Sequence, residues 1–225
     1  MDKVIKNIYN DIETISKKIN YGNDVKLVAV TKTVNVETIR KAYKLGLRDF
    51  GENRIQEAIP KMQLLSDLKD INWHFIGHLQ TNKVKKCKDF YMIQSISSME
   101  LLDLLANLSM EKRMNILIEV NSSREPSKSG VLPENIESFF DRLIKKNYHN
   151  IFSVRGLMTI GPLTDDRLKI RDAFKMTKKL YDNIQELFSI KFDTLSMGMS
   201  NDYDIAIEEG STMIRIGSKI FGERK

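Results

Sequence analysis

The sequence is poor in the features that mark secreted and membrane proteins. It has one cysteine, Cys87, and no apolar run near the ~20 residues that cross a bilayer. A single cysteine excludes an intramolecular disulfide, and its neighbours offer no metal-ligand or redox pairing. The first residues mix charged and apolar side chains, which is not the pattern of an export signal. We therefore expect a cytoplasmic protein with no membrane association.

Breaks in the chain are also scarce. There are only four prolines among 225 residues, with no low-complexity stretch and no obvious linker. A chain of this length can bury one full core. The composition predicts a single domain over residues 1–225.

Charge gives little support for nucleic-acid binding. Lys and Arg exceed Asp and Glu by 36 to 30, for a net charge of +6, but both signs are scattered along the chain. The densest basic run, Lys83–Lys88, contains no aromatic residue for base stacking. We interpret this run as a solvated surface, and we expect no nucleic-acid partner.

Apolar runs of strand length alternate with segments of helical periodicity. The first twenty residues repeat isoleucine at helical spacing and predict an amphipathic helix before the first strand. Helical spacing returns between the later apolar runs. Eight strands are predicted, at Lys26–Thr31, Leu47–Phe50, Trp73–Ile76, Tyr91–Ile96, Asn115–Val120, Val154–Ile160, Thr194–Met197 and Met213–Ile216.

Continuous apolar strands such as Leu27–Val30 are typical of a parallel sheet covered by helices. Eight strand–helix units favour an α/β fold that closes into a (β/α)8 TIM barrel with an extra N-terminal helix. The alternative is an open, doubly wound sheet. That fold usually has a glycine-rich turn after its first strand, whereas Thr31 and Lys32 follow Val30 here.

The residues beyond the predicted strands are polar and rich in glycine. In a barrel these positions converge on one mouth, where active sites lie. Lys32 ends an apolar strand, so its amine must be desolvated or have a partner. Gly198–Asp202 and Gly217–Ser218 follow the last two strands, where barrels commonly bind phosphate. Together these positions predict a phosphorylated ligand.

Arg215 alternates with two isoleucines in the last strand, so its guanidinium is expected to point into the barrel. Two interpretations remain open: a buried pair with a carboxylate, or contact with a ligand. With Lys32 on the adjacent first strand, an amine, a phosphate cup and a guanidinium would surround one pocket. That combination matches the needs of pyridoxal phosphate, whose aldehyde reacts with a lysine.

Six motifs follow one another along the sequence. They are Ala29–Thr33 (AVTKT), Gly51–Glu57 (GENRIQE), Trp73–Lys83 (WHFIGHLQTNK), Gly156–Ile160 (GLMTI), Leu195–Asp202 (LSMGMSND) and Arg215–Gly222 (RIGSKIFG). In this order they closely resemble the pyridoxal phosphate homeostasis protein family, a single-domain relative of the alanine racemase barrel. The loop Asn121–Gly130 also resembles the family's Glu-x-x-Lys-x-Gly segment.

The resemblance implies a barrel that binds pyridoxal 5′-phosphate covalently and acts in vitamin B6 and amino-acid homeostasis, without established catalysis. It implies that Lys32 is the Schiff-base lysine and that Asn53 lies beside the ring. It implies further that Arg215 faces the pyridine nitrogen. The phosphate would be held by Ser200, Gly217 and Ser218.

Arg215 also bears on whether the protein is an enzyme. An arginine opposite the pyridine nitrogen leaves that nitrogen unprotonated, which weakens the ring as an electron sink. The resembled racemases add a second domain that supplies a tyrosine, and we expect none here, since the sequence ends at Lys225. We therefore expect cofactor binding and delivery, with pyridoxal phosphate-dependent apoenzymes as candidate partners, from a monomer.

Two other functions stay open. One is a weak amino-acid racemase in which Lys32 is one base and His78 or Tyr203 the other. The second is a barrel for a different phosphorylated metabolite, with Lys32 as an ion-pair donor only. A metal site is not expected, because His74 and His78 lie four residues apart in a strand and its following turn, too far for easy co-ligation.

Overall fold

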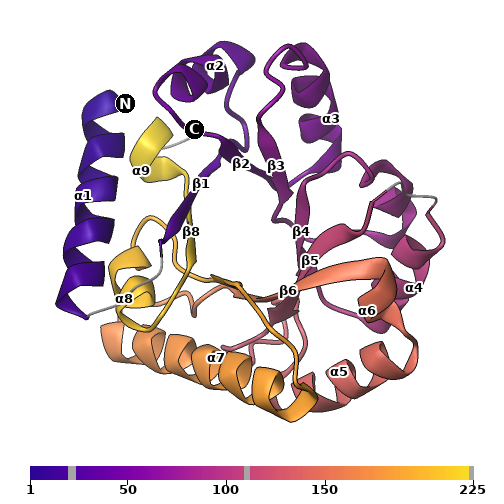
Figure 1. Ribbon diagram of the computed structural model, residues 1–225. Coiled ribbons are helices and arrows are strands. Elements are labelled where there is room, and N and C mark those ends of the chain that lie inside the picture. The colour runs from indigo at the N-terminus through magenta and orange to yellow at the C-terminus, as the bar shows by residue number, and fades with distance from the viewer. Residues whose placement is uncertain (20–23, 109–111, 223–225) are drawn as a thin grey trace.

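The computed structural model describes residues 1–19, 24–108 and 112–222. Within these ranges, eight strands pair in parallel and in chain order, and β8 pairs with β1 to close the barrel. Figure 1 looks down this barrel and shows the helices outside the strands. The predicted (β/α)8 barrel is therefore confirmed, and the open doubly wound sheet is excluded.

All eight strands lie within two residues of their predicted bounds. Their alternating side chains face the lumen or the outer helices. The strands are β1 (Lys26–Val30), β2 (Asp49–Glu52), β3 (Asn72–Phe75), β4 (Met92–Ile96), β5 (Met114–Val120), β6 (Phe152–Thr159), β7 (Thr194–Ser196) and β8 (Met213–Ile216).

The second strand is shifted by two residues at both ends from the predicted Leu47–Phe50. Gly51 and Glu52 belong to β2, because they pair with His74 and Phe75 of β3. The prediction missed them because glycine and glutamate are uncommon in strands. Asn53 is consequently the first residue beyond β2.

Helices connect the strands, and several begin at a side chain that caps the backbone. Asn35 accepts a hydrogen bond from the Thr38 N–H, Ser98 from Leu101, and Asp166 from two N–H groups. The helices are α1 (Asp2–Lys18), α2 (Val36–Lys44), α3 (Ile55–Leu64), η1 (Thr81–Lys86), α4 (Met99–Ala106), η2 (Pro133–Asn135), α5 (Ile136–Lys145), α6 (Tyr148–Ile151), α7 (Arg167–Phe188), α8 (Tyr203–Glu208) and α9 (Ser218–Phe221).

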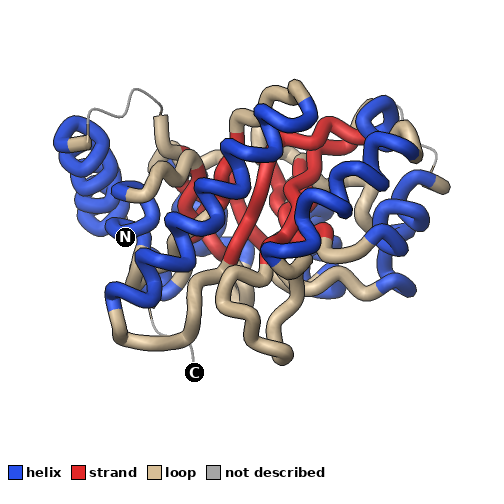
Figure 2. Tube along the Cα trace, turned by 90° about the horizontal axis from the view of Figure 1, so that it is seen from below, coloured by secondary structure: helices blue, strands red, loops and turns tan. Residues whose placement is uncertain are grey.

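The predicted N-terminal helix is α1; residue 20, at the end of its predicted range, lies outside the described residues. Ile5, Ile8 and Ile12 are buried, and the helix packs on α8 and α9. Figure 1 places it on the outside of the barrel, on the side of β1 and β8, and Figure 2 shows it at one side of the strands. It occupies the position of the outer helix that would follow β8, since α9 has only four residues. No described helix is both long and apolar enough to cross a membrane.

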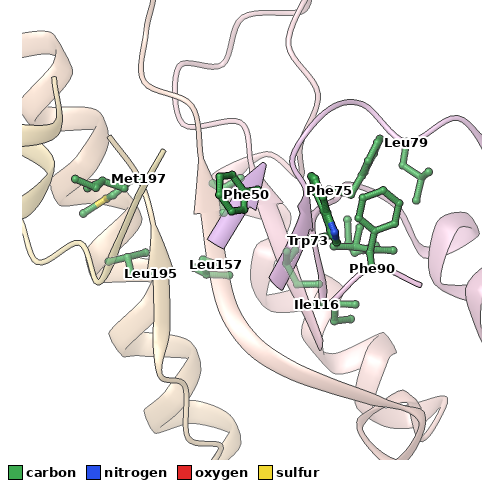
Figure 3. Close-up of a cluster of buried hydrophobic side chains, with 14 of the residues drawn as sticks. Phe50, Trp73, Phe75, Leu79, Phe90, Ile116, Leu157, Leu195 and Met197 are labelled. Atoms are coloured by element: carbon green, nitrogen blue, oxygen red, sulfur yellow. The ribbon is translucent and has the colours of Figure 1, made fainter. Parts of the chain in front are cut away.

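The core has two layers. Outside the barrel, aromatic side chains pack between strands and helices, with Phe50 against Trp73 and Phe75 edge-on to Phe90 (Figure 3). Inside, a smaller cluster fills the lumen, made of Val28, Met92, Leu117, Met158 and Met213. The filled lumen leaves the carboxyl ends of the strands as the place for a site.

Candidate functional site

A cleft of about 1070 Å³ opens at the carboxyl ends of β6, β7 and β8. It is of the size that small-molecule sites usually have. Its wall combines the predicted phosphate-binding residues with the loop that follows β6. The lining residues are Val30, Lys128, Ile160–Asp165, Arg167, Ile170, Met199–Asp202, Arg215, Gly217 and Ser218.

Arg215 lies at the base of the cleft and is only 4% exposed. Its Nη1 donates to Ser196 Oγ at 2.6 Å, and its Nη2 donates to the Thr159 carbonyl at 2.8 Å. Burial lowers the pKa of Arg215 to about 10, against the charges of Asp202 and Glu119. The guanidinium thus remains a cation at neutral pH. No carboxylate of the described residues forms a direct ion pair with it, so the structure does not support the buried-pair interpretation.

Glu119, on β5, is a second ionisable group in the mouth and was missed by the sequence reasoning. It is 5% exposed, and its Oε2 has no hydrogen-bond partner among the described residues. Burial raises the pKa of Glu119 to about 7, although the charge of Arg215 opposes the shift. A glutamate inside an otherwise apolar strand was the signal that could have identified it.

A smaller cavity of about 230 Å³ adjoins the cleft, and both are lined by Lys128 and Ile160. Asn53 and Glu119 line this cavity, and each has one buried oxygen without a partner in the described structure. Buried polar atoms are nearly always hydrogen-bonded in native proteins. These two acceptors are therefore available to a ligand or to water.

Lys32 follows β1 and is half-buried. Val30, two residues earlier, lines the cleft, whereas Lys32 itself is not among the lining residues. Among the residues that the structure describes, its side chain makes no hydrogen bond or ion pair. To reach the cleft, the side chain of Lys32 has to change its rotamer, and no hydrogen bond or ion pair within the described residues opposes that change.

The backbone beside Lys32 is firmly held. Thr31 donates its hydroxyl to Glu52 at 2.6 Å, and Lys61 of α3 donates to both Glu52 and the Thr31 carbonyl, at 2.7 and 2.8 Å. Glu52 is fully buried. This network ties the turn that carries Lys32 to β2 and α3.

The predicted phosphate-binding residues gather on two neighbouring loops. Ser200 lies in the loop after β7, Gly217 lies between β8 and α9, and Ser218 is the first residue of α9. Asp202 shapes the first loop by accepting the Met199 N–H at 2.6 Å. Hydroxyl groups and main chain at the start of a helical turn are a common environment for phosphate.

The structure thus brings four of the six predicted site residues to one cleft, namely Ser200, Arg215, Gly217 and Ser218. Asn53 lines the adjoining cavity, and Lys32 stands at the end of β1.

The candidate second bases of a racemase differ in position. His78 lines the smaller cavity and is hydrogen-bonded to Ser129, with 2.9 Å between His78 Nδ1 and Ser129 Oγ. Tyr203 is not a lining residue of the cleft; its hydroxyl donates to Asp11 of α1 and accepts from Lys219. Burial raises the pKa of Tyr203. Among the described residues no cluster of three or more His, Cys, Asp or Glu could hold a metal.

Comparison with known proteins gives one consistent family. The family described as "Alanine racemase, N-terminal domain" matches residues 5–225. A pyridoxal phosphate homeostasis protein of Aquifex aeolicus is 42% identical over 90% of this chain and 89% of its own length. One from Schizosaccharomyces pombe is 39% identical over 90% and 86%.

Solved structures of similar proteins have the same fold. PipY of Synechococcus elongatus, with PLP bound, superimposes with a TM-score of 0.80 at 32% identity, covering 94% of this chain and all of that one. Alanine racemase from Corynebacterium glutamicum shares the fold at 16% identity and a TM-score of 0.68, over 96% of this chain and 60% of its own.

Proposed function

Because the chain belongs to the pyridoxal phosphate homeostasis protein family, we propose that it binds pyridoxal 5′-phosphate in the mouth of the barrel and holds it on Lys32. One observation carries the proposal. A single cleft contains a buried arginine and a loop pair suited to phosphate, and it is lined by Val30, the last residue of β1, two residues before Lys32. The PLP-bound structure of the similar protein PipY supports the same ligand.

The residues present fit this cofactor. Ser200, Gly217 and Ser218 would receive the phosphate, and the Arg215 guanidinium would meet the ring nitrogen. Asn53 and Glu119, each with an oxygen that has no partner among the described residues, would face the remaining polar groups from the adjoining cavity. The cofactor supplies an aldehyde that takes up an amine.

Lys32 would make the covalent link. Its Nζ would be the amine that holds the cofactor, and the aldehyde would supply a reversible condensation with that amine, in which one water is released. The network of Thr31, Glu52 and Lys61 would hold the turn in place during this step.

We propose that the role is to hold and release the cofactor, in vitamin B6 and amino-acid homeostasis, rather than to turn over a substrate. A cationic arginine at the ring nitrogen does not keep that nitrogen protonated. In addition, the hydroxyl of Tyr203 is engaged by Asp11 and Lys219. Pyridoxal phosphate-dependent apoenzymes are the proposed recipients.

Borohydride reduction followed by peptide mapping tests the covalent link. Pyridoxal 5′-phosphate added to the protein should give a visible absorption band, and reduction should place the label on the peptide that contains Lys32. Lys32→Ala should lose both signals. Lys26→Ala, at the other end of β1, is the matched control and should keep them. A label spread over several lysines, or none, would contradict the proposal, and ligand binding without a label would favour a different phosphorylated metabolite.

A weak racemase activity remains the second candidate, because His78 lines the smaller cavity and could exchange a proton there. The test is the appearance of the opposite enantiomer when purified protein is incubated with single L-amino acids. Turnover that disappears in both Lys32→Ala and His78→Ala would establish this candidate and overturn the holding role.

A further inference from the structure

A chain of four hydrogen bonds runs from Arg215 through the barrel to the far end of β2. Arg215 donates to Ser196 Oγ at 2.6 Å, and Ser196 donates to Gln94 Oε1 at 2.6 Å. Gln94 Nε2 lies 3.0 Å from His74 Nδ1, and His74 Nε2 lies 2.9 Å from Asp49 Oδ1. The chain passes from β8 to β7, crosses the lumen to β4, and continues through β3 to β2.

The chain has only one possible direction. Arg215 has donors and no acceptor, so the Ser196 oxygen accepts and its single hydrogen is left for the Gln94 carbonyl. The Gln94 amide then donates to His74 Nδ1, which must be the unprotonated ring nitrogen. His74 Nε2 therefore carries the hydrogen and donates to Asp49. Burial acts to raise the pKa of Asp49, but hydrogen bonds from His74 and Asn72 and the charge of Lys26 hold it below its usual value.

Burying these polar side chains costs desolvation free energy, which an apolar core would avoid. Ser196, Gln94 and His74 are all fully buried. The neighbouring lumen is filled by apolar side chains such as Met92 and Leu117, so apolar packing is available at this level. Buried polar chains give orientation in return for the cost of desolvation. The group they orient is Arg215, which faces the cleft.

We propose that Ser196, Gln94, His74 and Asp49 are positioning residues that hold the Arg215 guanidinium where it meets an aromatic ring nitrogen. The inference rests on the proposed function, which supplies the pyridine nitrogen of pyridoxal 5′-phosphate. Gln94 is the decisive link, because its amide must accept at one end and donate at the other.

Two substitutions of Gln94 separate positioning from packing. Gln94→Leu keeps the approximate volume but breaks the chain on both sides. Gln94→Glu still accepts from Ser196 and can accept from His74 once Nδ1 is protonated, so it preserves the hold on Arg215. If packing alone mattered, the buried new carboxylate would be the more harmful change.

The measurement compares two ligands, pyridoxal 5′-phosphate and its 1-deaza analogue, which has CH in place of the ring nitrogen. Gln94→Leu should weaken binding of the cofactor by roughly tenfold, the value of a lost charged hydrogen bond, and change binding of the analogue less than about twofold. Gln94→Glu should bind both ligands nearly as the unaltered protein does. Equal weakening of both ligands by Gln94→Leu, or no weakening, would overturn the proposal.

Ser196→Ala is the second variant if Gln94→Leu fails to fold, and it should give the same ligand discrimination. Thr177→Val, which removes a fully buried hydroxyl on α7, is its control and should give none. Nitrogen NMR of the histidine ring in ligand-free protein is independent of cofactor binding. It should find His74 with Nε2 protonated and Nδ1 bare. A protonated Nδ1 would contradict the hydrogen-bond chain from Arg215 to Asp49. Failure of the unaltered protein to bind the cofactor would refute the proposed function alone.

Discussion

At the scale of single residues, the mouth of the barrel is defined by two buried charges that do not touch. Arg215 remains a cation although burial lowers its pKa, and Glu119 has a pKa raised to about 7. Arg215 could be predicted to face inward, because alternation within an apolar strand determines its side. Glu119 follows the same alternation. Its role depends on how close β5 comes to Arg215 of β8 at the mouth, and the linear sequence does not contain that distance.

Glu119 should make stability depend on pH. Its pKa rises from 4.5 in the unfolded chain to about 7 in the folded protein, so its favourable contribution is complete below pH 4.5 and is lost as pH rises through 7. In Glu119→Gln, the loss of unfolding free energy between pH 5 and 8 should be smaller by about 2 kcal/mol. Urea unfolding at a series of pH values measures this change. The exposed Glu137→Gln is the control, and an unchanged slope in Glu119→Gln would contradict the prediction.

Cys87 should be unreactive in the folded protein. It is fully buried, and burial raises the pKa of its thiol to about 12, so almost no thiolate exists at neutral pH. We expect reaction with an aromatic disulfide reagent to be at least about a hundredfold slower in native protein than in urea-unfolded protein. Comparable rates in the two states would show that the helical turn around Cys87 opens readily.

At the scale of elements, the turn after β1 depends on a neighbouring strand and helix. Glu52 of β2 and Lys61 of α3 hold Thr31 in place, and the carboxylate of Glu52 is fully buried. The sequence reasoning assigned Glu52 to a loop and attached no role to Lys61. Only the pairing of Gly51 and Glu52 with β3 reveals that Glu52 lies in a strand and needs a partner.

Lys61→Met should destabilise the protein by about 3 kcal/mol at pH 8, because it leaves the Glu52 carboxylate buried without its cation. Burial already raises the pKa of Glu52. The loss should therefore shrink as the pH is lowered and Glu52 becomes protonated. Chemical denaturation at pH 8 and pH 5 is the measurement, with the exposed Lys41→Met of α2 as control. An equal loss at both pH values would argue against this role of Glu52.

At the scale of the whole molecule, α1 completes the outer ring of helices. It packs on α8 and α9 beside the strands that close the barrel (Figure 1). Its Asp11 accepts a hydrogen bond from Tyr203 of α8. Its amphipathic pattern was readable in the sequence. Its position was not, because periodicity shows which face is buried and not what it is buried against.

Ile8→Ala should cost about 3 kcal/mol, since Ile8 is fully buried in α1 and its removal leaves a cavity. We expect the loss to appear as one cooperative unfolding transition at lower urea, because α1 is part of the barrel's core. Asn7→Ala, on the exposed face, should have little effect. A separate early transition in Ile8→Ala would mean that α1 detaches before the barrel unfolds.

The sequence by itself determined the fold class and the family, since eight apolar strands, helical periodicity and six ordered motifs are all local patterns. It also placed Lys32 and the loops Gly198–Asp202 and Gly217–Ser218 at strand ends, and Arg215 inside the last strand. Only the tertiary structure decided which side chains meet across the lumen. The path from Arg215 to Asp49 joins five strands, and Asn53 and Glu119, whose buried oxygens lack a partner in the described part of the chain, line one cavity. Such contacts depend on barrel closure and register, which bring together residues that are distant in the chain.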